Sequence, residues 1–187
     1  MGAVPEWCNG LEENIHHFSI DYHIDKNDFN YELMELYYNA GFLVMNLDLM
    51  RKDKIEEKFF KNFQKYPDIP LLDQDIINMV CYDKIKPISS KWNFLVSYLG
   101  AKDHKIRFKD KEFYNDFKLS IKNAKMAHFL MRRKPNIIYK SIFHLYSYSI
   151  LNRYKMKFWE YVAMTDWKNE KTYKVVYKFP FGFLNKK

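Results

Sequence analysis

The stretch "LYYNAGFLVMNLDLMR", residues 36–51, decides how the first half of the chain is organised. Its apolar run predicts a buried strand over 38–47, and the charged pattern that follows predicts an amphipathic helix over 48–66. The turn-forming triplet Asn39-Ala40-Gly41 stands at the mouth of that strand. Two interpretations are open. The triplet is only a local bend, or it presents the Asn39 carboxamide to a ligand.

The composition is that of one folded domain in a reducing compartment. The 187 residues are 48% hydrophobic and 19% aromatic, which is ample for a packed core and argues against intrinsic disorder. With only 5 glycines, the chain contains no glycine-rich phosphate-binding loop. Cys8 and Cys81 lie far apart in sequence, which argues against a disulfide framework and a zinc knuckle. We see no secretory leader and no run of about 18 apolar residues, so no membrane span is predicted.

Charge is distributed unevenly along the chain. Residues 1–80 hold 7 Lys/Arg and 15 Asp/Glu, whereas residues 81–187 hold 24 and 8. Such asymmetry favours an anionic partner for the second half, and nucleic acid, nucleotide phosphate and anionic lipid all qualify. The alternative is a solvated basic surface. No nucleic-acid-binding motif is found, so a nucleic acid partner is not expected.

The remaining pattern alternates strands and helices, which predicts an α/β fold. Residues 1–35 are polar and acidic, and we expect them to be irregular. The other predicted elements are a helix with Asp73 as its N-cap, a short strand over 84–89, a loop and a helix within 101–122, an apolar strand over 124–131 and a helical segment over 137–167.

Four separated pieces of the chain carry a family resemblance: "YYNAGFLVMNL", "LLDQDIINMV" with "KWN" after it, "AHFLMRRKP" and "FWEYVAMT". In order and spacing they resemble the C-terminal half of glycosyltransferase family 8, over roughly residues 1–170. The resemblance implies an incomplete GT-A-type mixed sheet flanked by helices, without the N-terminal nucleotide-binding half. It also implies a retaining hexosyltransferase that moves a sugar from a UDP-hexose to a glycan or glycolipid.

Two departures from the family pattern bear on activity. The D-x-D pair that binds Mn²⁺ in the family is absent, because the resemblance places Asp73-Gln74-Asp75 at a later motif. Met131 and Asn136 stand where the family has Gly and Trp. We therefore expect that this chain alone transfers no sugar. The alternative is a non-catalytic, truncated remnant or interaction module.

The resemblance implies roles for five residues, each with a plainer alternative. Asp73 would bind donor-sugar hydroxyls and Gln74 would stabilise charge at the anomeric carbon; the alternative is helix capping. Asn39 would bond sugar hydroxyls, unless it is only the bend. His128 would be a Mn²⁺ ligand, or else a core histidine. Lys134 would contact the leaving phosphate, or lie on a solvated face.

Residues 171–187 form a basic, aromatic tail. Lysines alternating with aromatic residues suit an anionic membrane surface, and the alternative is a final helix or strand that packs on the body. Together with the resemblance, this indicates surface polysaccharide or lipopolysaccharide synthesis. The expected location is the cytoplasm, with a peripheral position at the inner face of the membrane as a second option.

Overall fold

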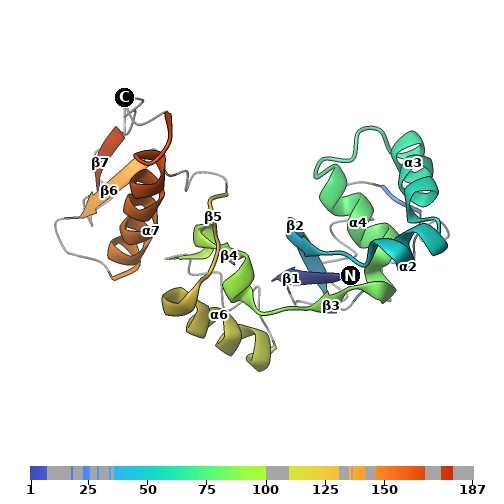
Figure 1. Cartoon of the computed structure of the whole chain (residues 1–187), viewed down its shortest axis with the longest axis horizontal. Coiled ribbons are helices and arrows are strands. Elements are labelled where there is room, and N and C mark those ends of the chain that lie inside the picture. Colours follow the sequence, from blue (N-terminus) through green and yellow to red (C-terminus); the bar gives the residue numbers. More distant parts are fainter. Residues whose placement is uncertain are drawn as a thin grey trace. The chain divides into compact units, whose positions relative to one another are not determined.

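The computed structural model divides the chain into two compact units (Figure 1). The first is formed by Met1–Asn93 with Asp103–Met126, and the second by Phe94–Lys102 with Ala127–Lys187. Each unit is described by itself. The residues that the structure describes are 1–7, 18, 23–25, 29, 34, 36–99, 110–130, 135, 137–141, 146–166 and 174–178.

A sheet in the order β2-β1-β3 organises the first unit. Strand β1 (Gly2–Trp7) pairs antiparallel with β2 (Tyr37–Val44) and parallel with β3 (Lys86–Pro87). The prediction of a strand after residue 38 is confirmed. The prediction that the first 35 residues are irregular is wrong for β1. Pro5 argues against a strand in the sequence pattern, because proline is disfavoured inside a sheet. It is accepted here where the pairing of β1 with β2 is irregular.

The β1–β2 pair is irregular at two points, and both change where side chains lie. Pro5 faces Tyr38 and Trp7 faces Tyr37, so Glu6 is an extra residue on β1. Ala3 faces Leu43 and Val4 faces Asn39, so residues 40–42 are extra on β2. The Asn-Ala-Gly triplet is thus the start of a bulge within the strand. Bulges re-aim side chains and occur often beside functional sites.

The predicted helix over 48–66 is two helices, α2 (Leu47–Lys52) and α3 (Ile55–Lys65). Asn46 caps α2, its side chain accepting a hydrogen bond from the Leu49 N–H at 3.1 Å. The chain breaks at Lys54, whose φ of 54° is left-handed. The amphipathic pattern continues across this break, so the pattern alone does not reveal it.

Helix α4 (Asp73–Cys81) packs against β2 and contributes much of the core. Its N-cap is Leu72, with a φ of 43°, so the prediction of Asp73 as N-cap is wrong by one residue. Its buried apolar side chains enter two clusters. The larger cluster comprises Phe18, Ile24, Phe29, Met34, Tyr37, Ile69, Ile76 and Met79.

Three short 3₁₀ turns follow: η3 (Tyr82–Lys84), η4 (Ser90–Trp92) and, in the second unit, η5 (Val96–Tyr98). Helix α6 (Lys111–Asn123) confirms the helix predicted within 101–122, and residues 101–109 lie outside the described part. Asp116 on α6 holds the start of η4, because its carboxylate accepts hydrogen bonds from the Ser89 hydroxyl and the Ser90 N–H, both at 2.6 Å.

The described residues of the second unit form two parallel strand pairs and one long helix. Strand β4 (Phe94–Leu95) pairs with β5 (Ala127–His128), and β6 (Ile137–Ser141) pairs with β7 (Lys174–Lys178). Helix α7 covers Tyr146–Val162. The prediction of helix from residue 137 is therefore wrong for β6, whose β-branched start suits a strand once β7 pairs with it. The strand predicted over 124–131 shrinks to β5.

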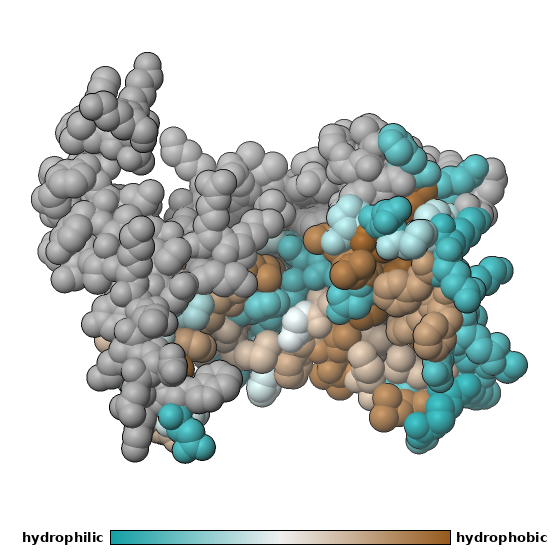
Figure 2. Space-filling view, turned by 90° about the horizontal axis from the view of Figure 1, so that it is seen from above, coloured by the Kyte–Doolittle hydropathy of each residue, from teal (hydrophilic) through white to brown (hydrophobic). Residues whose placement is uncertain are grey.

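Apolar side chains reach the surface of the described part in several places, seen as brown areas in Figure 2. One run continues from the end of β2 into α2, where Val44, Leu47 and Leu49 are each 55% exposed. No helix within the described residues is both long and apolar enough to cross a membrane.

The left-handed Lys54 generates a stability prediction. That conformation costs a non-glycine residue about 1–2 kcal/mol, and glycine avoids this cost. Glycine also loses more conformational entropy on folding, which offsets part of the stabilisation. Lys54→Gly should therefore raise the free energy of unfolding, by up to about 1 kcal/mol. Chemical denaturation followed by circular dichroism measures the change.

Lys58→Gly is the matched control, because Lys58 is an exposed lysine inside α3. Glycine there should lower the free energy of unfolding by about 1 kcal/mol. Equal losses from both variants would show that Lys54 does not adopt the left-handed conformation in solution.

Candidate functional site

A hydrogen-bonded pair of carboxamides joins β2 to α4. Asn39 on β2 is only 3% exposed, and Gln74 lies in the first turn of α4. The Asn39 Nδ2 donates to Gln74 Oε1 at 3.0 Å, and the Ala40 N–H donates to the same oxygen at 3.1 Å. The Asn39 Oδ1 accepts from the Gly41 N–H at 2.9 Å. The structure thus brings together two of the residues that the sequence analysis proposed for sugar binding.

Glu6 joins this pair from β1. Its Oε2 accepts from Gln74 Nε2 at 2.7 Å and from Asn39 Nδ2 at 3.0 Å. Glu6 was not predicted as a site residue, because nothing in the local sequence pattern marks it. It lies within residues 1–170, over which the family resemblance extends, but outside the four pieces that carry it.

Tyr37 and Asp75 extend the network into the core. The Tyr37 hydroxyl donates to Asp75 Oδ1 at 2.5 Å and accepts from Gln74 Nε2 at 3.2 Å. Asp75 is fully buried, and its Oδ2 accepts from the Leu71 N–H at 3.1 Å. Burial, and then the adjacent Asp75 carboxylate, raise the pKa of the Tyr37 phenol well above its usual range. The phenol therefore stays protonated and remains a donor.

Two further asparagines complete the arrangement. Asn93 Nδ2 donates to Asn39 Oδ1 at 2.6 Å, which ties the end of η4 to the bulge of β2. The Asn78 side chain accepts a hydrogen bond from the Tyr38 N–H and donates one to the Tyr38 carbonyl, both at 2.8 Å. These two bonds hold the β2 backbone against α4. We call the set Glu6, Tyr37, Asn39, Gln74, Asp75, Asn78 and Asn93 the amide network.

Asp73 differs from its neighbours in the same motif. It is the first residue of α4 and its side chain is exposed, whereas Asp75 is buried. A carboxylate at a helix N-terminus is favoured by the helix dipole, and an exposed one can accept hydrogen bonds from a ligand. Within the Asp73-Gln74-Asp75 motif, the first side chain is exposed and the other two take part in the network.

The structure does not test the other two proposed site residues, His128 and Lys134. His128 is half-buried on β5 in the second unit. Lys134 lies outside the described residues, as do Met131 and Asn136. Among the side chains that the structure describes, no three of His, Cys, Asp or Glu come together to hold a metal ion. The Mn²⁺ site therefore stays a prediction.

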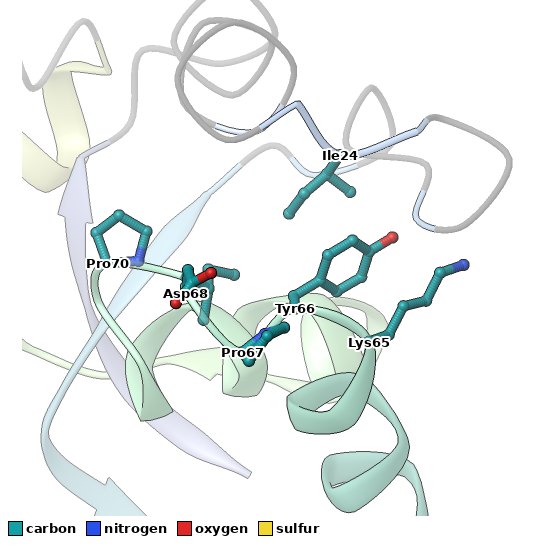
Figure 3. Close-up of a pocket in the computed structure, with 7 residues that line it drawn as sticks. Ile24, Lys65, Tyr66, Pro67, Asp68 and Pro70 are labelled. Atoms are coloured by element: carbon teal, nitrogen blue, oxygen red, sulfur yellow. The ribbon is translucent and has the colours of Figure 1, made fainter.

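A separate pocket in the first unit has a different character (Figure 3). Its volume is about 350 Å³, and its walls come from the end of α3, the turn into α4 and Ile24. The residues that line it are Ile24, Lys65, Tyr66, Pro67, Asp68, Ile69 and Pro70. None of them belongs to the amide network, so this pocket does not locate the candidate site.

Removing the Tyr37 hydroxyl should destabilise the protein. Tyr37→Phe removes the hydroxyl that donates to the buried Asp75 carboxylate, and a hydrogen bond to a charged group contributes about 1.5–3 kcal/mol. The matched control is Tyr38→Phe, because the Tyr38 hydroxyl donates to the Ile85 carbonyl at the longer distance of 3.4 Å. This variant should lower the free energy of unfolding by about 1 kcal/mol or less. Urea denaturation compares the two, and equal losses would contradict the importance of the Tyr37–Asp75 bond.

The raised Tyr37 pKa predicts a loss of stability in alkali. The unfolded phenol ionises above about pH 10, while the folded one keeps its proton. Stability from this residue is complete below that pH and then falls by about 1.4 kcal/mol per pH unit as the pH rises. Tyr37→Phe should flatten this decline, and Tyr161→Phe, at an exposed tyrosine, should leave it unchanged. Denaturation midpoints between pH 9 and 11 provide the measurement, and an unchanged decline in Tyr37→Phe would contradict the prediction.

The family model for glycosyl transferase family 8 matches residues 5–135, more than half of the chain. The matched region contains every residue of the amide network. It also contains the quoted pieces of sequence up to Pro135.

Two curated proteins are similar in sequence. General stress protein A of Bacillus subtilis (strain 168) is 22% identical over 134 residues, which are 70% of this chain and 42% of that protein. A Haemophilus influenzae protein named "Putative glycosyltransferase" is 37% identical over 59 residues, 31% of this chain and 18% of that protein. The chain spans less than half the length of either relative.

A solved structure supports the fold. The apo structure of the bifunctional glycosyltransferase WbbM matches with a TM-score of 0.59 and 18% identity, over 91% of this chain and 29% of that one. This structural similarity confirms the predicted mixed α/β fold of GT-A type. With a family model covering most of the chain and a glycosyltransferase fold to match, this protein belongs to glycosyltransferase family 8.

Proposed function

We propose that the amide network supports the donor-sugar site of a retaining hexosyltransferase that uses a UDP-hexose. The observation that carries the proposal is the link from Gln74 to Asn39, reinforced by Glu6. The resemblance assigns both amides to the sugar site, and the structure joins them in one hydrogen-bonded unit. A role in glycosyl transfer follows from family membership, and the donor, acceptor and pathway are proposed.

Retaining transfer breaks the bond between the anomeric carbon and the diphosphate oxygen and forms a bond to an acceptor hydroxyl on the same face. The diphosphate leaves with the electron pair, and the acceptor hydroxyl loses its proton. Positive charge grows on the sugar ring meanwhile, so groups fixed around the ring before the reaction contribute most. A rigid network beneath the sugar satisfies this requirement.

We expect Asp73 to bind the sugar, and Gln74 and Asn39 mainly to support the site. Asp73 would accept hydrogen bonds from donor-sugar hydroxyls, because its carboxylate is exposed at the start of α4. The Gln74 carbonyl already accepts two internal hydrogen bonds, so contact with the sugar would add to these or replace one. Asn39 is buried, and we propose that it acts chiefly by holding Gln74 and the bulge of β2.

The leaving-group side of the reaction is proposed from resemblance. Mn²⁺, when bound, would neutralise the departing diphosphate, and His128 has the imidazole donor that this metal accepts. Lys134 would contact the leaving phosphate. No step of the transfer described above depends on these assignments.

The acceptor is proposed to be a surface glycan or a glycolipid of polysaccharide or lipopolysaccharide synthesis, made at the cytoplasmic face of the membrane. Residues 174–178 of the basic, aromatic tail form strand β7, in keeping with the alternative of a final strand, and the tail over 171–187 would in addition hold the chain against anionic lipid there. Lipid-linked acceptors are presented at such a surface, which makes the two proposals compatible.

A second candidate function is a non-catalytic interaction module. The observation that favours it is the saturation of Asn39, whose amide has all of its hydrogen-bonding atoms engaged within the chain. Such a network would hold the fold together without any sugar. The two functions differ in whether UDP-hexoses bind.

Sugar-nucleotide binding can be tested residue by residue. Titration of the ¹⁵N-labelled chain with UDP-glucose and UDP-galactose should shift the amide resonances of Asp73 and Gln74. Asp73→Asn should weaken binding about tenfold or more, because a hydrogen bond to a charged group is lost.

The control is Asp83→Asn, at an exposed carboxylate beyond the other end of α4. It should bind like the wild type. No shift at Asp73 and Gln74 with either donor, up to millimolar concentration, would reject donor binding by this chain and favour the interaction module.

A further inference from the structure

We infer that Glu6 is the positioning residue of the candidate sugar site. Its carboxylate locks the Gln74 and Asn39 carboxamides in the orientation that two backbone N–H groups require. The inference deepens the proposed function, because its consequence for sugar binding depends on that function. Its geometric basis is separate and consists of the contacts of three side chains and two backbone N–H groups.

Two backbone donors decide the orientation of both amides. The Ala40 N–H lies 3.1 Å from Gln74 Oε1, and the Gly41 N–H lies 2.9 Å from Asn39 Oδ1. A backbone N–H can only donate, so each side chain must present its oxygen there. The two NH₂ groups consequently face away from these positions and require acceptors of their own.

Both NH₂ groups converge on one carboxylate oxygen. Gln74 Nε2 and Asn39 Nδ2 lie 2.7 and 3.0 Å from Glu6 Oε2. An ionised carboxylate can only accept, so it matches two NH₂ groups without a competing donor. Hydrogen bonds to an ionised acceptor are roughly twice as strong as neutral ones. Glu6 therefore locks the two amides in one orientation more firmly than a neutral residue of the same shape would.

The remaining amide hydrogens are also used. Gln74 Nε2 donates its second hydrogen to the Tyr37 hydroxyl at 3.2 Å, and Asn39 Nδ2 donates its second to Gln74 Oε1 at 3.0 Å. Removal of the Glu6 carboxylate would leave two part-buried hydrogens without this acceptor. Such groups are costly to leave unsatisfied, so the amides would turn toward other partners.

The strand places Glu6 for this task. Glu6 is the extra residue of β1 between Pro5, which faces Tyr38, and Trp7, which faces Tyr37. Val4, two residues earlier on β1, faces Asn39, so alternation along the strand puts Glu6 on the same side as Asn39. From there its carboxylate reaches Asn39 and also Gln74, at the start of α4.

The test compares Glu6→Ala, Glu6→Gln and Ile55→Val with the wild-type chain. Ile55 is a buried residue of α3 with no hydrogen bond to the amide network, so Ile55→Val lowers stability without touching Glu6. Two readouts are recorded: solvent exchange of the Gln74 and Asn39 side-chain NH₂ hydrogens by NMR, and the Kd for UDP-hexose. The first does not depend on sugar binding.

We expect the Gln74 and Asn39 NH₂ hydrogens to exchange at least tenfold faster in Glu6→Ala, with a smaller change in Glu6→Gln, which keeps the shape and loses the charge. The Kd should rise about tenfold in Glu6→Ala. Ile55→Val should leave both readouts unchanged. If Glu6→Ala does not fold, Glu6→Gln carries the comparison.

Other outcomes separate the two hypotheses. A folded Glu6 variant with unchanged NH₂ exchange would overturn the inference. Faster exchange with an unchanged Kd would overturn the role of Glu6 in sugar binding. If the Glu6 variants show faster NH₂ exchange but the wild-type chain binds no UDP-hexose, the positioning of the amides is upheld and the proposed function is rejected.

Discussion

The first unit depends on one requirement: polar side chains between β2 and α4 must find partners inside the protein. Asn78 and Asp75 are fully buried, and Asn39 nearly so. A buried polar group without a partner costs about 1–3 kcal/mol, so each of these side chains restricts the position of its neighbours. Asn78 fixes the β2 backbone, and Gln74 fixes the bulge that follows Asn39. The core then packs on either side of this junction.

That junction lies where the sheet is least regular. Val4 faces Asn39, so regular alternation along β1 puts Glu6, two residues further on, on the same side as Asn39. The extra residues 40–42 of β2 follow Asn39 directly, and the Ala40 N–H at their start donates to Gln74. Structural and functional interpretations therefore meet in the same residues. The network stabilises the fold, and it also holds Gln74 beside an exposed Asp73.

Family membership gives this arrangement its functional meaning. The family model matches the residues of the network, and the similar structure is a glycosyltransferase. The amides of the network are saturated, and the carboxylate of Asp73 beside it is exposed. In the proposed enzyme the saturated amides would act as a preorganised support, and the sugar contacts would fall to the side chains that remain exposed. The Asp-Gln-Asp motif would then combine two tasks in three consecutive residues.

Local periodicity and the quoted motifs were sufficient to predict the strand after residue 38, a helix beginning near Asp73, the α/β class and the family. They also led to Asn39, Asp73 and Gln74 as candidate site residues. Most of the other features depend on contacts between segments that are distant in sequence. Strand β1 contains a proline and exists because β2 and β3 supply its partners; the helix break rests on one left-handed residue, Lys54; and β6 is a strand because β7 pairs with it. Glu6 became a site residue only through its hydrogen bonds to Gln74 and Asn39, which lie far from it in sequence, since periodicity describes a chain locally and cannot say which distant group will satisfy an amide.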